Sequence, residues 1–66
     1  MHMVDPLTRA NRYKERAVEC MRLAEIASDH EIAGHYRQIA EEYLTLAQGE
    51  LTLAAAQEVV RKQSDQ

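Results

Sequence analysis

The chain has 66 residues, a net charge of −3 and a single cysteine, Cys20. One small domain of this length buries only about 60% of the surface of its unfolded chain, and a lone cysteine excludes an intrachain disulfide and a structural zinc site. The single cysteine fits the reducing cytoplasm, and without a disulfide or zinc site we expect so small a core to be shared with a second chain. The acidic balance argues against general nucleic-acid binding.

The first helix is predicted over residues 5–27. Asp5-Pro6 is a typical start, because aspartate caps the first free N–H groups and proline suits the first helical position. The following pattern contains no glycine or proline as far as Ala27. We expect both ends of the chain to be frayed, before Asp5 and from Ser64 to Gln66.

The second helix is predicted over residues 30–62. Ser28 and Glu31 have the spacing of a capping box, and Asp29 adds negative charge at the helix start. A turn of two or three residues makes the helices antiparallel neighbours. Gly34 and Gly49 are weak points of this helix. A close backbone approach would explain Gly34, and Gly49 would allow a bend, but the heptad passes through it in phase and favours a continuous helix.

Alanine recurs at every seventh position in both predicted helices, which is typical of a seam that faces a partner helix along its length. The fold class is therefore all-α, an antiparallel two-helix hairpin packed closely on alanine. With alanine at heptad position a, tyrosine and cysteine fill position d. The predicted hairpin seam comprises Ala10, Tyr13, Ala17, Cys20, Ala24, Ala33, Tyr36, Ala40, Tyr43 and Ala47.

Residues 13–24 and 36–47 form an internal repeat, with tyrosine, alanine, glutamate and a Leu-Ala pair at matching positions. The same residues give the chain a resemblance. The pattern from Tyr13 through Glu19-Cys20 to Leu23-Ala24, with Tyr36 in the second helix, resembles short uncharacterised alphaproteobacterial helical-hairpin proteins of the Y-x-x-x-A-x-E-C-x-x-L-A type. It covers roughly residues 12–48, and departs at His30, where proline is usual, and at Tyr43, where tryptophan is frequent. The resemblance implies a hairpin fold and a bacterial cytosol, and it carries over no catalytic or binding residue.

A second apolar column runs down the second helix beside the seam. We call it the Ile/Leu column, and it comprises Ile32, Ile39, Leu46, Leu53 and Val60. Leu44 and Leu51 add apolar surface on the other flank, so this helix is apolar over a wider arc than one partner helix covers. The second helix is also longer, and the first is expected to run out near residue 52, leaving Leu53, Ala54, Val59 and Val60 beyond it. The pattern therefore predicts a homodimeric four-helix bundle, with the Ile/Leu column as the oligomer interface.

Few residues are candidates for catalysis or metal binding. Glu31 and His35 share a helix face, but carboxylate-bridged metal sites use a Glu-x-x-His spacing from two helices, so a cap carboxylate and a solvated histidine are favoured. His30 and His35 point about 140° apart and cannot chelate one ion together. Cys20 has no histidine at helical spacing and is expected to pack as a small buried hydrophobe. We expect no catalytic, cofactor-binding or metal site and no cofactor.

The remaining charged and aromatic residues are also interpreted structurally. Arg9, Arg12 and Arg16 form a basic strip, and antiparallel pairing would bring Arg9 near Glu50 and Arg16 near the Glu41-Glu42 pair. The seam tyrosines are expected to fill the space that alanine leaves.

Together these features predict a non-catalytic protein–protein interaction module, a small bundle-forming adaptor. One alternative is a carrier of a metal or small ligand in the bundle interior, with Cys20, His30 and His35 as its only candidate groups. A weaker alternative is a regulator that docks an acidic or nucleic-acid partner through the basic strip. The partners predicted are a second copy and, as a further alternative, another protein bound through the second helix, but no membrane.

Overall fold

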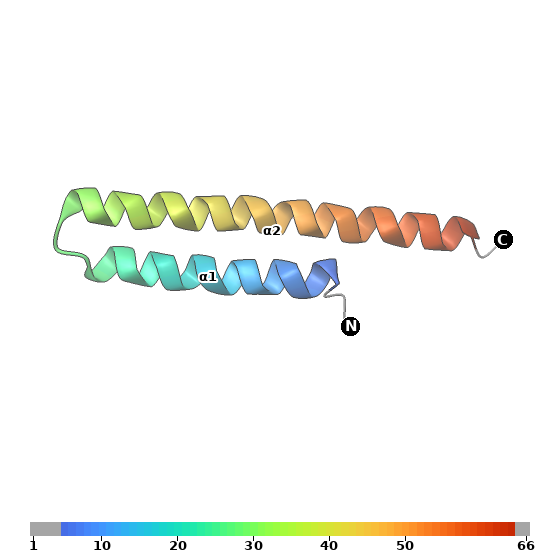
Figure 1. Ribbon diagram of the computed structural model, residues 1–66, viewed down its shortest axis with the longest axis horizontal. Helices are drawn as coiled ribbons and strands as arrows, with labels where there is room; N and C mark the ends of the chain where they lie inside the picture. Colours follow the sequence, from blue (N-terminus) through green and yellow to red (C-terminus); the bar gives the residue numbers. More distant parts are fainter. Residues whose placement is uncertain (1–4, 65–66) are drawn as a thin grey trace.

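The computed structural model describes residues 5–64 and contains two helices, α1 (Pro6–Ile26) and α2 (His30–Ser64), packed side by side and antiparallel. Figure 1 shows α2 extending well past the start of α1. The two-helix hairpin predicted from the alanine heptads is confirmed. The frayed ends predicted at residues 1–4 and 65–66 lie outside the described residues, whereas Ser64, expected beyond the second helix, is the last residue of α2.

The start of α1 follows from Asp5 and Pro6. The Asp5 carboxylate accepts a 2.7 Å hydrogen bond from the N–H of Thr8, and the Asp5 carbonyl accepts one of 3.1 Å from the N–H of Arg9. Pro6 takes the first helical position, where its missing N–H costs nothing, and is itself buried. The helix ends where Ala27 turns to an extended conformation and donates its N–H to the carbonyl of Leu23.

The start of α2 differs from the capping box expected at Ser28. The side chain that caps it is that of Asp29, whose Oδ1 accepts a 2.8 Å hydrogen bond from the N–H of Glu31. The Asp29 carbonyl also accepts the first helical hydrogen bond, from Ala33. The cap is one residue later because α2 begins at His30, and the residue directly before the first helical position is the one whose side chain reaches the free N–H groups.

Both glycines lie inside α2, which is continuous through them. A Cβ added at either Gly34 or Gly49 would meet no heavy atom within 4 Å. The close backbone approach suggested for Gly34 is therefore wrong within the hairpin. The continuous helix favoured at Gly49 is confirmed, because α2 is a single helix through this residue.

The hairpin is long and thin. It measures 57 × 22 × 13 Å, with a radius of gyration of 16.0 Å, whereas a compact domain of this length would have a radius of gyration of about 11 Å. No helix among residues 5–64 is long and apolar enough to cross a membrane. Because the hairpin is only one helix thick, α1 and α2 each keep most of their circumference open to solvent.

Candidate interaction surface

The contact between α1 and α2 is made of alanine. Six alanines are buried, each with at most 4% of its surface exposed: Ala10, Ala17, Ala24, Ala33, Ala40 and Ala47. We call this set the alanine seam. A methyl group at every second turn leaves room for the two helix backbones to approach, which is why alanine recurs at the same heptad position in both helices. Apart from these alanines and Pro6, no residue with a described side chain is buried.

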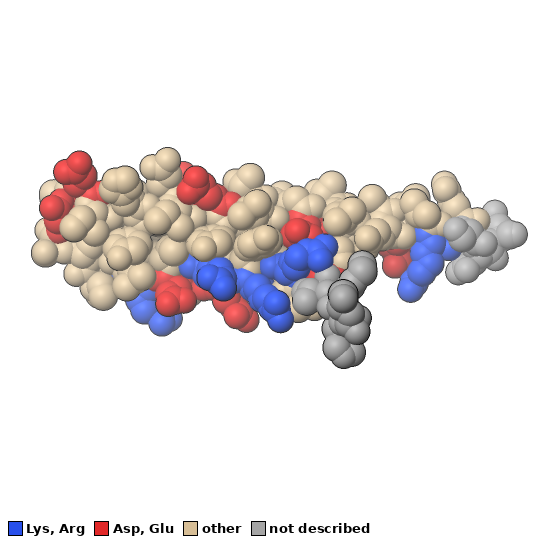
Figure 2. All heavy atoms as spheres, viewed as in Figure 1, with Lys and Arg blue, Asp and Glu red and all other residues tan. Residues whose placement is uncertain are grey.

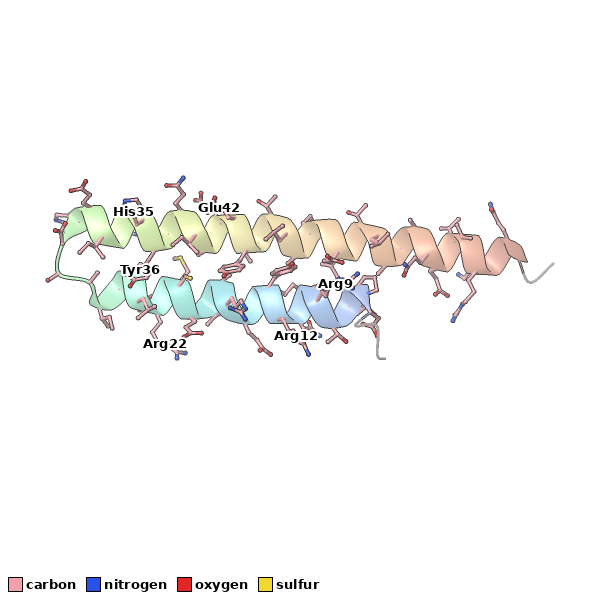
Figure 3. All side chains as sticks on the ribbon, viewed as in Figure 1. Arg9, Arg12, Arg22, His35, Tyr36 and Glu42 are labelled. Carbon is pink, nitrogen blue, oxygen red and sulfur yellow. The ribbon has the colours of Figure 1, made fainter. Side chains whose placement is uncertain are left out.

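The other predicted members of the hairpin seam flank the alanines. Tyr13 and Tyr43 stack across the helix pair with ring centroids 6.1 Å apart and an interplanar angle of 29°. Tyr36 lies between the helices in Figure 3 and, like Cys20, is half-buried. The prediction that Cys20 is a buried hydrophobe is thus only partly met, because position d lies at the edge of a seam as narrow as this one. The half-buried tyrosines fill the space beside the alanine methyl groups, while their outer edges reach solvent.

The Ile/Leu column lies outside the contact. Its exposed fractions are 50% for Ile32, 38% for Ile39, 49% for Leu46, 43% for Leu53 and 61% for Val60. These residues lie beside the alanine seam on α2, on a flank that α1 does not cover. About half of the surface of these residues therefore faces solvent in the isolated hairpin.

A second apolar surface joins the two helices on the opposite flank, where Leu44 was predicted but its neighbours on α1 were not. Val18 and Met21 of α1 and Leu44 of α2 line one shallow groove together with Ala17. The signal was present in the heptads, because Met21 and Leu44 both occupy position e, on the same side of an antiparallel pair.

The charged residues divide between the helices. Figure 2 shows Lys and Arg gathered over α1 and near the C-terminal end of α2. Arg9 pairs with Glu50 as predicted, with 2.9 Å between Nε and Oε1. The pairing expected between Arg16 and the Glu41-Glu42 pair is not formed within the described residues. Arg16 lies at the flank of the hairpin rather than in the seam, and it remains exposed to solvent.

The residues considered for metal or ligand chemistry are dispersed. Glu31, His30 and His35 are all exposed at the start of α2, while Cys20 lies half-buried on α1. Among residues 5–64, no three His, Cys, Asp or Glu side chains come together in a way that could hold a metal ion. Within residues 5–63, whose side chains are described, no polar or charged side chain is buried, and polar groups beside the seam, such as those of Cys20 and Tyr36, are half-buried.

The part of α2 that extends beyond the start of α1, which we call the overhang, begins later in the sequence than expected. Ala54 was expected to lie beyond the first helix, but it is half-buried and lines one groove together with Asp5, Pro6 and Leu7. The start of α1 therefore reaches Ala54 because the capped first turn, with Pro6 inside it, extends the contact. From Ala55 to Gln63 every residue is exposed.

Comparison of the chain with protein-family models, curated proteins and solved structures finds no match. The resemblance to alphaproteobacterial hairpin proteins stays a prediction. Arguments about function therefore rest on the surface of the hairpin itself.

Proposed function

We propose that the chain is a non-catalytic interaction module that assembles through α2 into a homodimeric four-helix bundle. The observation that carries this proposal is the inverted distribution of apolar residues. Eleven large apolar side chains are exposed between residues 5 and 64, while the buried core of the hairpin consists of alanine and Pro6.

The free energy gained by burying side chains, compared with the backbone entropy lost on folding, favours a permanent partner. Burying a leucine or isoleucine side chain contributes about 1.5–3 kcal/mol, whereas an alanine contributes a single methyl group, worth about 0.8 kcal/mol. Ordering each residue costs about 1–2 kcal/mol of backbone entropy. A hairpin stabilised by alanine contacts alone has little to offset that cost, so a second surface must cover the exposed leucines and isoleucines. A second copy of the chain is always present at the chain's own concentration.

The interior supports an interaction role better than a carrier role. A carrier needs a cavity lined by polar or ligating groups, whereas the described residues bury only alanines and Pro6, and Cys20 and the tyrosines lie at the edge of the seam. The exposed apolar surface, by contrast, is organised at heptad spacing, as in helices that pack on other helices.

The test replaces two central members of the Ile/Leu column with lysine. We expect the wild-type protein to be a dimer at micromolar concentration, as measured by sedimentation or light scattering, and the Leu46→Lys/Leu53→Lys variant to be a monomer with reduced helix content. The matched control is Thr45→Lys/Thr52→Lys. These threonines are the preceding residues, are exposed, and bond only to carbonyls of their own helix.

The control should dimerise like the wild type, since it adds the same charge on the side of α2 that faces away from α1. A wild-type protein that is monomeric and well folded at these concentrations would contradict the dimer.

A further inference from the structure

The C-terminal half of α2 carries a second seam in addition to the alanine seam. Leu46, Leu53 and Val60 are spaced by seven residues, and Gly49 and Ala56 each follow a leucine by three. This is the a-and-d spacing of a helix-packing seam, with large residues in one column and small residues in the other. All five residues are exposed. We call them the large–small seam.

The alternation of large and small residues determines how two copies of this seam fit together. In a parallel pair, residues at the same position face each other, so leucine would meet leucine and Gly49 would meet Gly49, which leaves a gap beside the glycines. In an antiparallel pair, the large column of one copy lies against the small column of the other, so the side chains fill the space.

We infer that the large–small seam is where two copies of α2 pack antiparallel, related by a two-fold axis close to Leu51. This inference rests on the proposed homodimer and adds its orientation and register. The register follows from the positions of the small residues. Placing Leu53 against Gly49 of the second copy also places Leu46 against its Ala56, and both pairs centre the overlap on residue 51.

A different register would centre the overlap on Leu46 and set the Ile/Leu column on itself. That register brings Glu42 to the level of Glu50 of the second copy, so two carboxylates approach each other. The register centred on residue 51 avoids this contact. It covers Leu46, Leu53 and Val60 fully, reaches Ile39 at its edge, and leaves Ile32 outside the overlap.

The environment of Gly49 agrees with a second chain at this point. Glycine is unfavourable in a helix interior relative to alanine, and within the hairpin nothing lies near enough to Gly49 to exclude a side chain. Close packing of Leu53 from a second copy supplies the contact that would exclude one. Gly34 is equally open but lies on a different face of α2, outside the large–small seam.

The first experiment measures the dimer dissociation constant of Gly49→Leu, with Gly34→Leu as the matched control. We expect Gly49→Leu to raise the dissociation constant at least tenfold and Gly34→Leu to leave it within twofold of the wild type. If Gly49→Leu dimerised like the wild type while Leu46→Lys/Leu53→Lys dissociated, the register would be wrong and the homodimer would stand. If neither variant changed the wild-type assembly, the proposed function would fail as well.

The second experiment measures orientation. A nitroxide label is attached at Lys62→Cys in a Cys20→Ala background, and the distance between the two labels is measured by pulsed electron paramagnetic resonance. Residue 62 lies 11 positions from the axis in each copy, so at 1.5 Å per residue we expect about 33 Å. Labels in a parallel pair would lie at the same level along the helices and, because residue 62 points away from the seam, roughly two helix diameters apart, about 20–24 Å. A distance in that shorter range would overturn the antiparallel arrangement.

Discussion

At the scale of single residues, Asp5 is the group whose titration the fold changes most clearly. The N–H of Thr8 donates to its carboxylate, and this hydrogen bond, aided by the Thr8 hydroxyl and the Arg9 charge, lowers the pKa of Asp5. A carboxyl whose pKa is lower in the folded state stabilises the fold above its unfolded pKa, which is about 3.9. That contribution is lost as the pH falls through the folded pKa.

We therefore expect the Asp5 carboxyl to titrate below its ordinary range in the folded protein, as followed by NMR of the side-chain carbonyl. Asp5→Asn is the control, because asparagine caps helices about as well as aspartate but does not titrate. In this variant the part of the acid-induced loss of stability that belongs to Asp5 should disappear. Titration of Asp5 in the ordinary range would show that its carboxylate does not hold the cap in solution.

At the scale of the helices, the alanine seam determines how closely α1 and α2 pack. Ala17 and Ala40 are 2% and 1% exposed, so a larger side chain at either position must push the helices apart. We expect Ala17→Leu and Ala40→Leu each to lower the free energy of unfolding by about 1–3 kcal/mol, the usual cost of overpacking. Ala55→Leu is the control, because Ala55 is exposed on the overhang and outside both seams. It should change stability by less than about 0.5 kcal/mol, as measured by urea denaturation. Unchanged stability in both seam variants would mean that the helices meet elsewhere.

The helices could be predicted from the sequence because each is specified by local signals that agree. Asp5-Pro6 starts α1, and the alanine heptads identify the facing sides of both helices. The cap of α2 was harder to place, because Ser28 and Asp29 are both good capping residues and only the register of the first helical turn decides between them. The groove at Val18, Met21 and Leu44 was missed for a related reason. It is built from two helices, so it depends on how they are paired as well as on the face of either one.

At the scale of the whole molecule, the sequence predicts surplus apolar surface but not what covers it. The Ile/Leu column and the groove at Met21 lie on opposite flanks of the hairpin, so one partner helix cannot bury both. The arginines also show that contacts outside the seam could not be predicted from the sequence. Arg9 finds Glu50 because both lie beside the seam, whereas Arg16 lies on a flank whose neighbours depend on how the hairpin associates.

The thinness of the hairpin leads to a prediction about its folding equilibrium. Because the exposed leucines and isoleucines are expected to be buried only on association, folding and dimerisation should be coupled, and dilution should favour the unfolded chain. We expect the melting temperature of the wild type, followed by circular dichroism, to rise by several degrees for each tenfold increase in protein concentration. The Leu46→Lys/Leu53→Lys variant should melt at a lower temperature that does not depend on concentration, because it has lost the associating surface. The contrary result is a wild-type melting temperature that stays constant over a hundredfold range of protein concentration spanning the dimer dissociation constant. It would mean that the alanine seam alone stabilises the hairpin and that the Ile/Leu column is not needed for folding.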